Sequence, residues 1–179
     1  MKPEQVIRFW FYKKGPRDWF FSKKPGLDAL IRKKFLKTYL AVVQGETADW
    51  RKTPRGRLAE IIVLDQFSRN MFRGTPEMYR YDPLALALAQ EALRVGADKK
   101  LSKDERMFMY LPFEHSESKH IQKQSLKLFK KIWGKDMLKY AIDHKNIVDR
   151  FGRFPHRNKI LGRKSTTAEK KFMRTHKGY

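Results

Sequence analysis

Cysteine is absent from the sequence of 179 residues. Its absence excludes disulfide bonds and zinc sites built from thiolates, and it is compatible with a reducing compartment. Long apolar runs are also missing, because no stretch approaches the roughly 20 residues that a membrane-spanning helix requires. The N-terminal segment 1–10 has an amphipathic pattern and lacks the uninterrupted apolar core of a signal peptide. We therefore expect a soluble, cytoplasmic protein without a membrane span.

Acidic residues are scarce: 19 Asp and Glu stand against 41 Lys and Arg, which gives a formal net charge of +22. Such an excess attracts nucleic acid or anionic lipid. The lysines are nevertheless spread along the whole chain, and most aromatic residues lie at core spacing instead of alternating with basic residues. This distribution favours nonspecific nucleic-acid binding at low salt over specific recognition. The alternative is a basic, solvated surface without a function of its own.

Sequence motifs for cofactors and metals are missing as well. The chain has no glycine-rich phosphate-binding loop, no Rossmann fingerprint, no zinc-protease motif and no Gly-x-Ser-x-Gly. The segment 111–117 offers Glu and His side chains, but their spacing matches no strong metal-binding pattern. We therefore predict neither a metal ion nor a cofactor.

Apolar residues recur at helical spacing, in about eight segments separated by turn residues. The expected helices span residues 3–12, 27–44, 55–72, 82–95, 102–111, 117–133 and 135–151, with a short last helix capped by Thr166 and Glu169. The apolar run Ile61–Leu64, which resembles a strand, lies inside a longer helical period. Helices joined by short turns predict an all-α fold without a sheet, a stack of antiparallel helical hairpins in a single domain of residues 1–179.

Residues with strong turn or capping preferences indicate where the helices begin and end. Gly45 is expected to end one helix, and Asp82-Pro83 to supply the N-cap and the first position of another. The run Ser102–Glu105 matches the capping-box pattern, and Pro112 is expected to end or kink the helix that follows. The segment 15–26, which contains Trp19, Phe20 and Phe21, is bracketed by Gly-Pro and Pro-Gly and is expected to form a loop.

Ionisable residues occupy inward positions in the expected helix 55–72. Asp65 lies four residues after Ile61 and three after Ile62, so it shares their apolar face. Arg69 follows one turn later and can reach the carboxylate, and Arg73 lies one further turn along. A buried carboxylate is costly without such a partner. The group is therefore either part of a binding site or a structural ion pair.

Two histidines take similar positions in later helices. His115 follows Leu111 by one turn, and His144 lies between Tyr140 and Val148 on an apolar face. A histidine in such a place is either a hydrogen-bonded core residue or a proton carrier or anion ligand. Together with Asp65, they place one ionisable group on the inward face of each of three helices, as an interior site would require.

The segment Asp149–Asn158 is the densest polar stretch of the chain. Its candidate binding residues are Arg150, Arg153, His156, Arg157 and Asn158. Because Gly152 and Pro155 force a tight path, the arginines are held in a geometry that suits a carboxylate or a phosphate, with backbone amides beyond Pro155 adding to the site. The alternative is that they clamp helix C-terminal carbonyls and the Asp65 carboxylate.

Several blocks of the sequence together resemble a mainly bacterial family, domain of unknown function 924. The blocks are Phe9–Phe11, Trp19-Phe20, Leu64–Gly74, Asp82, Glu105-Arg106, Leu111–Glu117, His144, Arg150–Asn158 and Leu161–Arg163. The resemblance covers nearly the whole chain, although this chain has Ser68 where the family usually has Pro. It implies an all-helical fold similar to tetratricopeptide-like hairpins, and it implies no activity.

Three functional hypotheses follow from these observations. The first is binding of a small anionic ligand or an acidic peptide group by Asp65, Arg69, Asn70, Arg73, Glu117, Arg150, Arg153, His156, Arg157 and Asn158. The second is a hydrolytic or phosphoryl-handling enzyme in which His115, His144 or His156 is the acid or base and Asp65 orients it. The third is a protein-interaction or nucleic-acid adaptor that uses basic outer faces. The sequence leaves the ligand, the reaction and the oligomeric state open.

Overall fold

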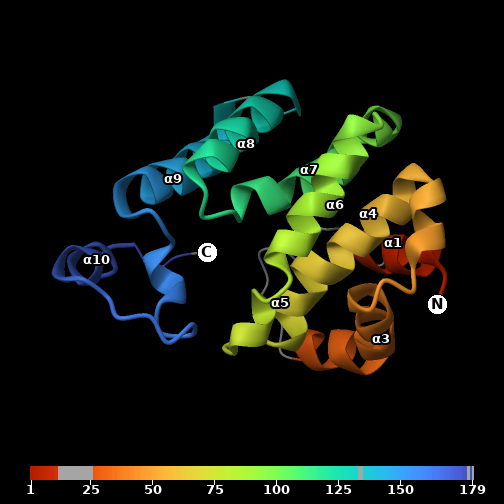
Figure 1. Ribbon diagram of the computed structural model, residues 1–179, viewed down its shortest axis with the longest axis horizontal. Coiled ribbons are helices and arrows are strands. Elements are labelled where there is room, and N and C mark those ends of the chain that lie inside the picture. Colours follow the sequence, from red (N-terminus) through yellow and green to blue (C-terminus); the bar gives the residue numbers. More distant parts are fainter. Residues whose placement is uncertain (12–25, 133–134, 177, 179) are drawn as a thin grey trace. The chain divides into compact units, whose positions relative to one another are not determined.

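A computed structural model describes residues 1–11, 26–132, 135–176 and 178 (Figure 1). Every regular element in these ranges is a helix, and they contain no strand, so the predicted all-α class is confirmed. The run Ile61–Leu64 is helical, as expected. The expected loop around Trp19, Phe20 and Phe21 lies outside the described residues.

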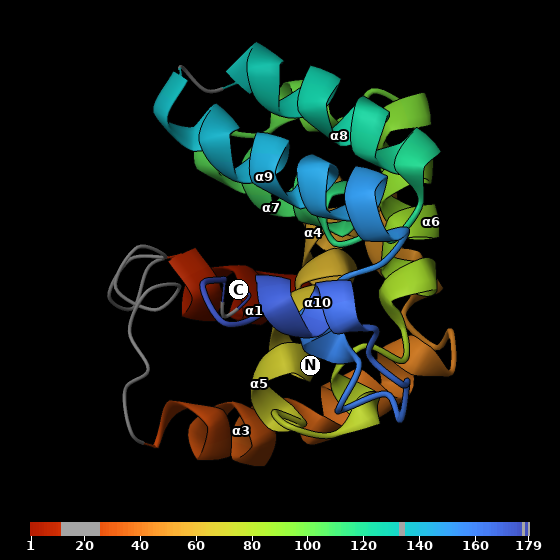
Figure 2. The same ribbon diagram turned by 90° about the vertical axis from the view of Figure 1, so that its left-hand side faces the viewer.

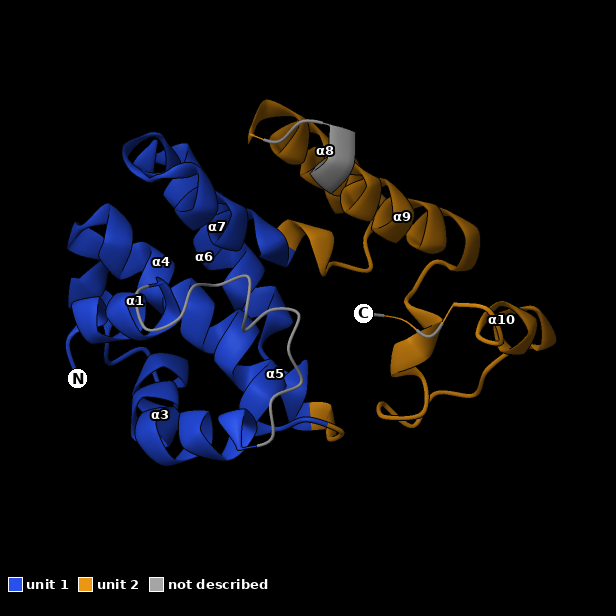
Figure 3. Ribbon diagram, turned by 180° about the vertical axis from the view of Figure 1, so that it is seen from behind, with its two compact units in different colours: residues 1–73, 77–112 blue, residues 74–76, 113–179 orange. Residues whose placement is uncertain are grey.

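The chain divides into two compact units, coloured separately in Figure 3. Unit 1 consists of residues 1–73 and 77–112, and unit 2 of residues 74–76 and 113–179. The expected single domain stays a prediction.

Unit 1 contains most of the helices. They are α1 (Pro3–Phe11), α3 (Leu27–Val43), α4 (Pro54–Ile62), the π-helix η2 (Val63–Phe67), α5 (Ser68–Met71), α6 (Asp82–Arg94) and most of α7 (Lys103–Glu114). Its core is a cluster of buried aromatic rings. The ring of Phe35 lies 4.7 Å from that of Phe9 and 4.5 Å from that of Phe67, and Trp10 lies 5.5 Å from Phe108. This core fixes α1, α3, η2 and α7 against one another.

Unit 2 is built on the helical hairpin of α8 (Lys119–Ile132) and α9 (Lys135–Phe151), which lie side by side and antiparallel (Figures 1 and 2). A short 3₁₀ turn, Pro155–Arg157, and the helix α10 (Thr167–Phe172) follow. The core is smaller than that of unit 1. It contains Ile147, Val148 and Phe154, with Phe151 and Phe172 packed against it.

Most expected helix ends agree with the structure. Gly45 follows α3 with a φ of 76°, in the left-handed region that favours glycine. The predicted capping box at Ser102–Glu105 forms through two hydrogen bonds, and Thr166 with Glu169 forms another at α10. The sequence pattern therefore located these ends through local hydrogen bonds that the residues themselves supply.

Two helix ends differ from the expected ones. Pro112 was expected to end or kink its helix; it does not end it, because α7 continues to Glu114, and a kink at this residue stays a prediction. Proline lacks an N–H group and disturbs the preceding turn, and only two helical residues follow it here, so the helix stops soon afterwards. Asp82 does not cap α6: it is the first residue of the helix, Tyr81 is the N-cap, and no side-chain capping bond forms.

Candidate functional site

The π-helix η2 interrupts the helix that was expected to run through 55–72. Helices of this type are rare and occur mostly as single turns, often near functional sites. Asp65 lies in this π-helix, in the interior of unit 1, and its side chain is fully buried. The carboxylate accepts a hydrogen bond from the side chain of Gln66, and its Oδ1 atom lies 3.2 Å from Nη1 of Arg69.

Arg69 links Asp65 to a second carboxylate, that of Asp82. The guanidinium donates two hydrogen bonds of 2.8 Å to the Asp82 carboxylate and one of 2.7 Å to the backbone carbonyl of Asp65. Burial opposes the charge of Arg69, but the two nearby carboxylates outweigh it and raise the pKa of Arg69. The Asp82 carboxylate therefore pairs with Arg69 through two hydrogen bonds instead of capping α6 as expected.

The other two predicted residues of this segment contact a different carboxylate. Asn70 donates a hydrogen bond of 2.8 Å to Asp28, and Arg73 donates bonds of 2.6 and 3.1 Å to the same carboxylate. Arg73 is 55% exposed, whereas Arg69 is only 15% exposed. The arginines one turn apart therefore lie in different surroundings, and the Asp65, Arg69 and Asp82 group is separate from the Asp28 group.

In unit 2, two histidine side chains and one arginine lie around the ring of Phe154, and a third histidine lies beside one of them. We call His115, His144, Phe154, His156 and Arg157 the Phe154 cluster. The ring of Phe154 lies 5.5 Å from that of His144 and 5.6 Å from that of His156. The guanidinium carbon of Arg157 lies 4.6 Å from the centre of the Phe154 ring, and the rings of His115 and His144 are 6.4 Å apart.

Two histidines of this cluster, His144 and His156, are held in their neutral form. Burial lowers the pKa of His144 to about 3, although a hydrogen bond to the carbonyl of Tyr140 opposes the shift. Burial and the charge of Arg157 lower the pKa of His156 to about 4. Because a carbonyl oxygen can only accept, Nδ1 of His144 carries the proton in its 2.8 Å bond to Tyr140, and Nε2 carries the lone pair. The same Nδ1 lies 3.4 Å from the Glu114 carboxylate.

Glu117 is the carboxylate that joins the Phe154 cluster to the last part of the chain. It accepts bonds of 2.6 and 2.9 Å from Arg163 and one of 2.8 Å from the backbone N–H of Phe154. Burial raises the pKa of Glu117, but these hydrogen bonds and the charge of Arg157 reverse the effect and lower it overall. Asn158 accepts a further bond of 2.9 Å from Arg163.

The remaining predicted arginines lie at the edges of unit 2. Arg153 donates bonds of 2.7 and 2.9 Å to Glu169, and these bonds together with one from the backbone N–H of Thr166 lower the pKa of Glu169 to about 2. Arg150 is exposed and lies over the rings of Phe151 and Phe172. Neither arginine is part of the Phe154 cluster.

The structure thus divides the predicted site residues between the two units. Asp65, Arg69, Asn70 and Arg73 lie in unit 1, and His115, Glu117, His144, Arg150, Arg153, His156, Arg157 and Asn158 lie in unit 2. The expectation that they line one interior site stays a prediction. Sequence reasoning did not assign Asp82, Glu114 or Arg163 to a site. Each pairs with a residue that is distant in the sequence, and periodicity carries no signal for such pairing.

The described residues were also considered as possible metal ligands and membrane-spanning helices. They contain no group of three or more His, Asp or Glu side chains arranged to hold a metal ion. No helix within them is long and apolar enough to span a membrane.

The lysines of α8, among them Lys119, Lys123 and Lys127, are exposed. Nonspecific binding of nucleic acid by such basic faces stays a prediction.

The whole chain was compared with known families and structures. A family model described as a bacterial protein of unknown function (DUF924) matches residues 6–177. The chain belongs to this family. It is also similar to the solved structure of a protein of unknown function from Agrobacterium tumefaciens, with 39% identity, a TM-score of 0.91 and 97% of each chain covered. No match is found among curated proteins. The likeness to tetratricopeptide hairpins stays a prediction.

Proposed function

We propose that this protein binds a small oxyanion, a phosphate or carboxylate group, at the Phe154 cluster of unit 2. The observation that carries the proposal is the position of Arg157, which is only 6% exposed and lies beside histidines that burial keeps neutral. A cation in such low-dielectric surroundings attracts an anion far more strongly than a solvated one does. Neutral imidazole rings do not weaken the attraction between Arg157 and an anion, and their N–H groups can donate hydrogen bonds to the anion.

The surrounding charges support the same function. The guanidinium groups of Arg157 and Arg163 both act on the carboxylate of Glu117. Two cations around this carboxylate favour an additional negative group near Arg157. His115 and His156 are half-buried, so their rings are accessible enough to give an oxyanion directional hydrogen bonds. In this proposal Arg157 supplies the charge, and the two histidines supply the geometry.

Titration with inorganic phosphate and with succinate tests the proposal. We expect saturable binding in calorimetry, a higher melting temperature, and loss of both with Arg157→Gln. Arg80→Gln, which removes an exposed arginine of unit 1, is the matched control. Since Arg157→Gln can also weaken folding, the native protein gives a second measurement. Nuclear magnetic resonance signals of the His115 and His156 rings should shift on titration, and unchanged signals would rule the site out.

The pair of His144 and Glu114 favours acid–base catalysis as a second candidate function. Nε2 of His144 carries a lone pair. Burial lowers the pKa of the ring, and a bound anion together with the carboxylate 3.4 Å from Nδ1 would favour the charged form and let Nε2 accept a proton. The test is turnover of phosphate and carboxylate esters by native protein and by His144→Gln. Turnover that the substitution abolishes without loss of oxyanion affinity would establish catalysis. Absence of turnover in the native protein would leave binding alone.

A further inference from the structure

A groove of unit 1 is independent of the site proposed above. It follows α3 where this helix lies near Met1 and Gln5 of the N-terminal segment, and it has a volume of about 810 Å³. The lining residues on α3 run from Ala29 to Ala41, which corresponds to about 18 Å of helix at 1.5 Å per residue. The volume falls in the range of about 300–1,000 Å³ that ligand pockets usually have.

The floor of the groove is mostly apolar. Leu36 and Ala41 of α3 line it, and the half-buried ring of Trp50 lies among the lining residues beyond the end of that helix. The polar side chains of the lining are occupied within the protein. Thr47 donates a hydrogen bond of 2.6 Å to the buried Glu60, and the hydroxyl of Thr38 lies 3.4 Å from the sulfur of Met1. The floor therefore offers a ligand dispersion and apolar burial instead of hydrogen bonds.

The rim of the groove is basic. Lys33, Lys34 and Lys37 line it, and all three are exposed. Lys34 lies over the rings of Phe9 and Phe35, while Lys33 and Lys37 take part in no ion pair within the described part of the chain. Long lysine side chains can cover apolar surface with their methylene groups and keep the ammonium group at its edge.

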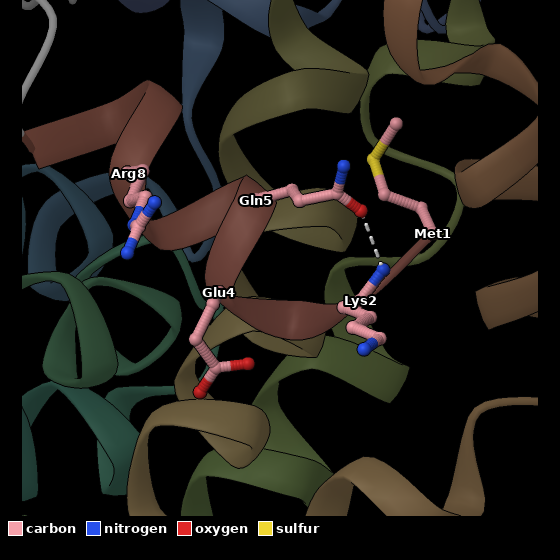
Figure 4. Close-up of a pocket in the computed structure, with 5 residues that line it drawn as sticks. All are labelled: Met1, Lys2, Glu4, Gln5 and Arg8. Carbon is pink, nitrogen blue, oxygen red and sulfur yellow. Dashed lines mark hydrogen bonds between the residues drawn. The ribbon is translucent and has the colours of Figure 1, made fainter.

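No acidic residue is among the described residues that line this groove. The neighbouring pocket on α1 differs in this respect. It has a volume of about 540 Å³ and includes Glu4 beside Lys2 and Arg8, so its charges are mixed. Figure 4 shows that its Gln5 side chain is already bound, accepting a hydrogen bond of 2.8 Å from the backbone N–H of Lys2. Of these two pockets, the α3 groove is the one that combines an apolar floor with a rim of one sign.

We propose that the α3 groove binds an anionic amphiphile, in which a carboxylate or phosphate group is attached to an apolar chain. The chain would lie along Leu36 and Ala41 toward Trp50, and the anionic group would be held by Lys33 and Lys37. Each half of the ligand matches one half of the groove. A free anion would gain nothing from the floor, and a neutral chain would gain nothing from the rim. Single-stranded nucleic acid fits less well, because it needs a series of stacking aromatic rings and Trp50 is the one aromatic lining residue among those described.

The test compares dodecanoate with two molecules that each lack half of its chemistry, dodecanol and acetate, all below the concentration at which dodecanoate forms micelles. We expect saturable binding of dodecanoate alone, seen as a change in tryptophan fluorescence. Trp50→Phe should keep the affinity, measured by calorimetry, and lose most of that change. Equal binding of dodecanol, equal binding of acetate, or no binding of dodecanoate would each overturn the proposal.

Matched substitutions separate the rim from the floor. Lys33→Gln combined with Lys37→Gln should weaken dodecanoate binding by roughly fivefold to tenfold, and the effect should disappear at high salt. Leu36→Asn should weaken it by roughly tenfold at any salt concentration. The control removes two exposed lysines of unit 2, Lys119→Gln with Lys123→Gln, and should leave the affinity unchanged. If this control lowers the affinity as much as the rim variant does, binding depends on net charge and the groove is not the site.

Discussion

The two units each bury ionisable side chains, but they do so in different ways. In unit 1, Arg69 is bound between the carboxylates of Asp65 and Asp82. In unit 2, the buried His144 and the half-buried His156 are neutral and share their surroundings with one cation, Arg157. The first arrangement satisfies its charges internally. In the second, burial disfavours the charged form of two histidines.

The two arrangements should contribute differently to the stability of the fold and to its response to pH. A buried ion pair that is fully matched stays charged over a wide pH range, and breaking it exposes a large desolvation cost. Neutral buried histidines cost little at neutral pH, but acid charges them against the cost of burial. We therefore expect the Asp65, Arg69 and Asp82 group to dominate the stability of unit 1, and the Phe154 cluster to dominate the response of unit 2 to acid and anions.

Substitution of Arg69 tests the half of this comparison with the larger expected effect, the buried ion pairs of unit 1. Arg69→Met keeps most of the side-chain volume and leaves two carboxylates without their guanidinium partner, so we expect a loss of about 3–5 kcal/mol in the free energy of unfolding. Urea denaturation measures the loss. Arg80→Met breaks an exposed pair with Glu77 and should cost less than about 1 kcal/mol. Equal losses in the two variants would show that the buried group has no special weight.

Lowering the pH tests the other half of the comparison, the neutral histidines of unit 2. The pKa of His144 is about 3 in the folded protein, below its ordinary value of 6.5, so the unfolded chain binds the proton more readily as pH falls below 6.5. The folded state should lose about 3 kcal/mol from this residue between pH 7 and pH 4. His144→Gln should remove that part of the pH dependence, measured by urea denaturation at each pH. His120→Gln, on the exposed face of α8, should retain it in full.

Periodicity predicted the helices well, because their apolar faces and capping residues are local features of the chain. The expected helix 27–44 is Leu27–Val43 in the structure, and the expected helix 135–151 is Lys135–Phe151. Periodicity did not predict η2, because a single added residue in a turn changes the register without disturbing the apolar pattern around Asp65. Local rules also favoured Asp82 as a cap, although a distant guanidinium binds its carboxylate with two hydrogen bonds.

The candidate site could be predicted only in part, for a related reason. Helical spacing correctly placed Asp65 and His144 in the interior. It could not identify the partner of each charge, since Arg153 binds Glu169 and Arg163 binds Glu117, which are distant in the sequence and meet only through tertiary packing. Sequence therefore indicated which residues are buried or polar. The structure was needed to show which of them contact one another.

The cap of α10 tests how strongly the end of unit 2 depends on local hydrogen bonds. The Thr166 hydroxyl accepts a bond of 3.2 Å from the backbone N–H of Glu169, whose carboxylate also binds Arg153. Thr166→Ala should destabilise this segment by about 1 kcal/mol and speed amide hydrogen exchange in 167–172. Lys159→Ala, which alters an exposed residue of unit 2 outside the helix, should change neither quantity. Faster exchange in α3 of unit 1 would contradict a local effect.

The smallest expected effect is at Arg73, one turn beyond Arg69 in the sequence. Its pair with Asp28 has a short distance of 2.6 Å, but the side chains are 55% and 40% exposed. Water already solvates both charges, so Arg73→Met should change the free energy of unfolding by no more than about 1 kcal/mol, and less at high salt. Urea denaturation of Arg73→Met and Arg69→Met under the same conditions compares the two losses directly. A loss at Arg73 as large as that at Arg69 would mean that burial does not decide the weight of an ion pair in this unit, and the contrast between matched and exposed charges would fail with it.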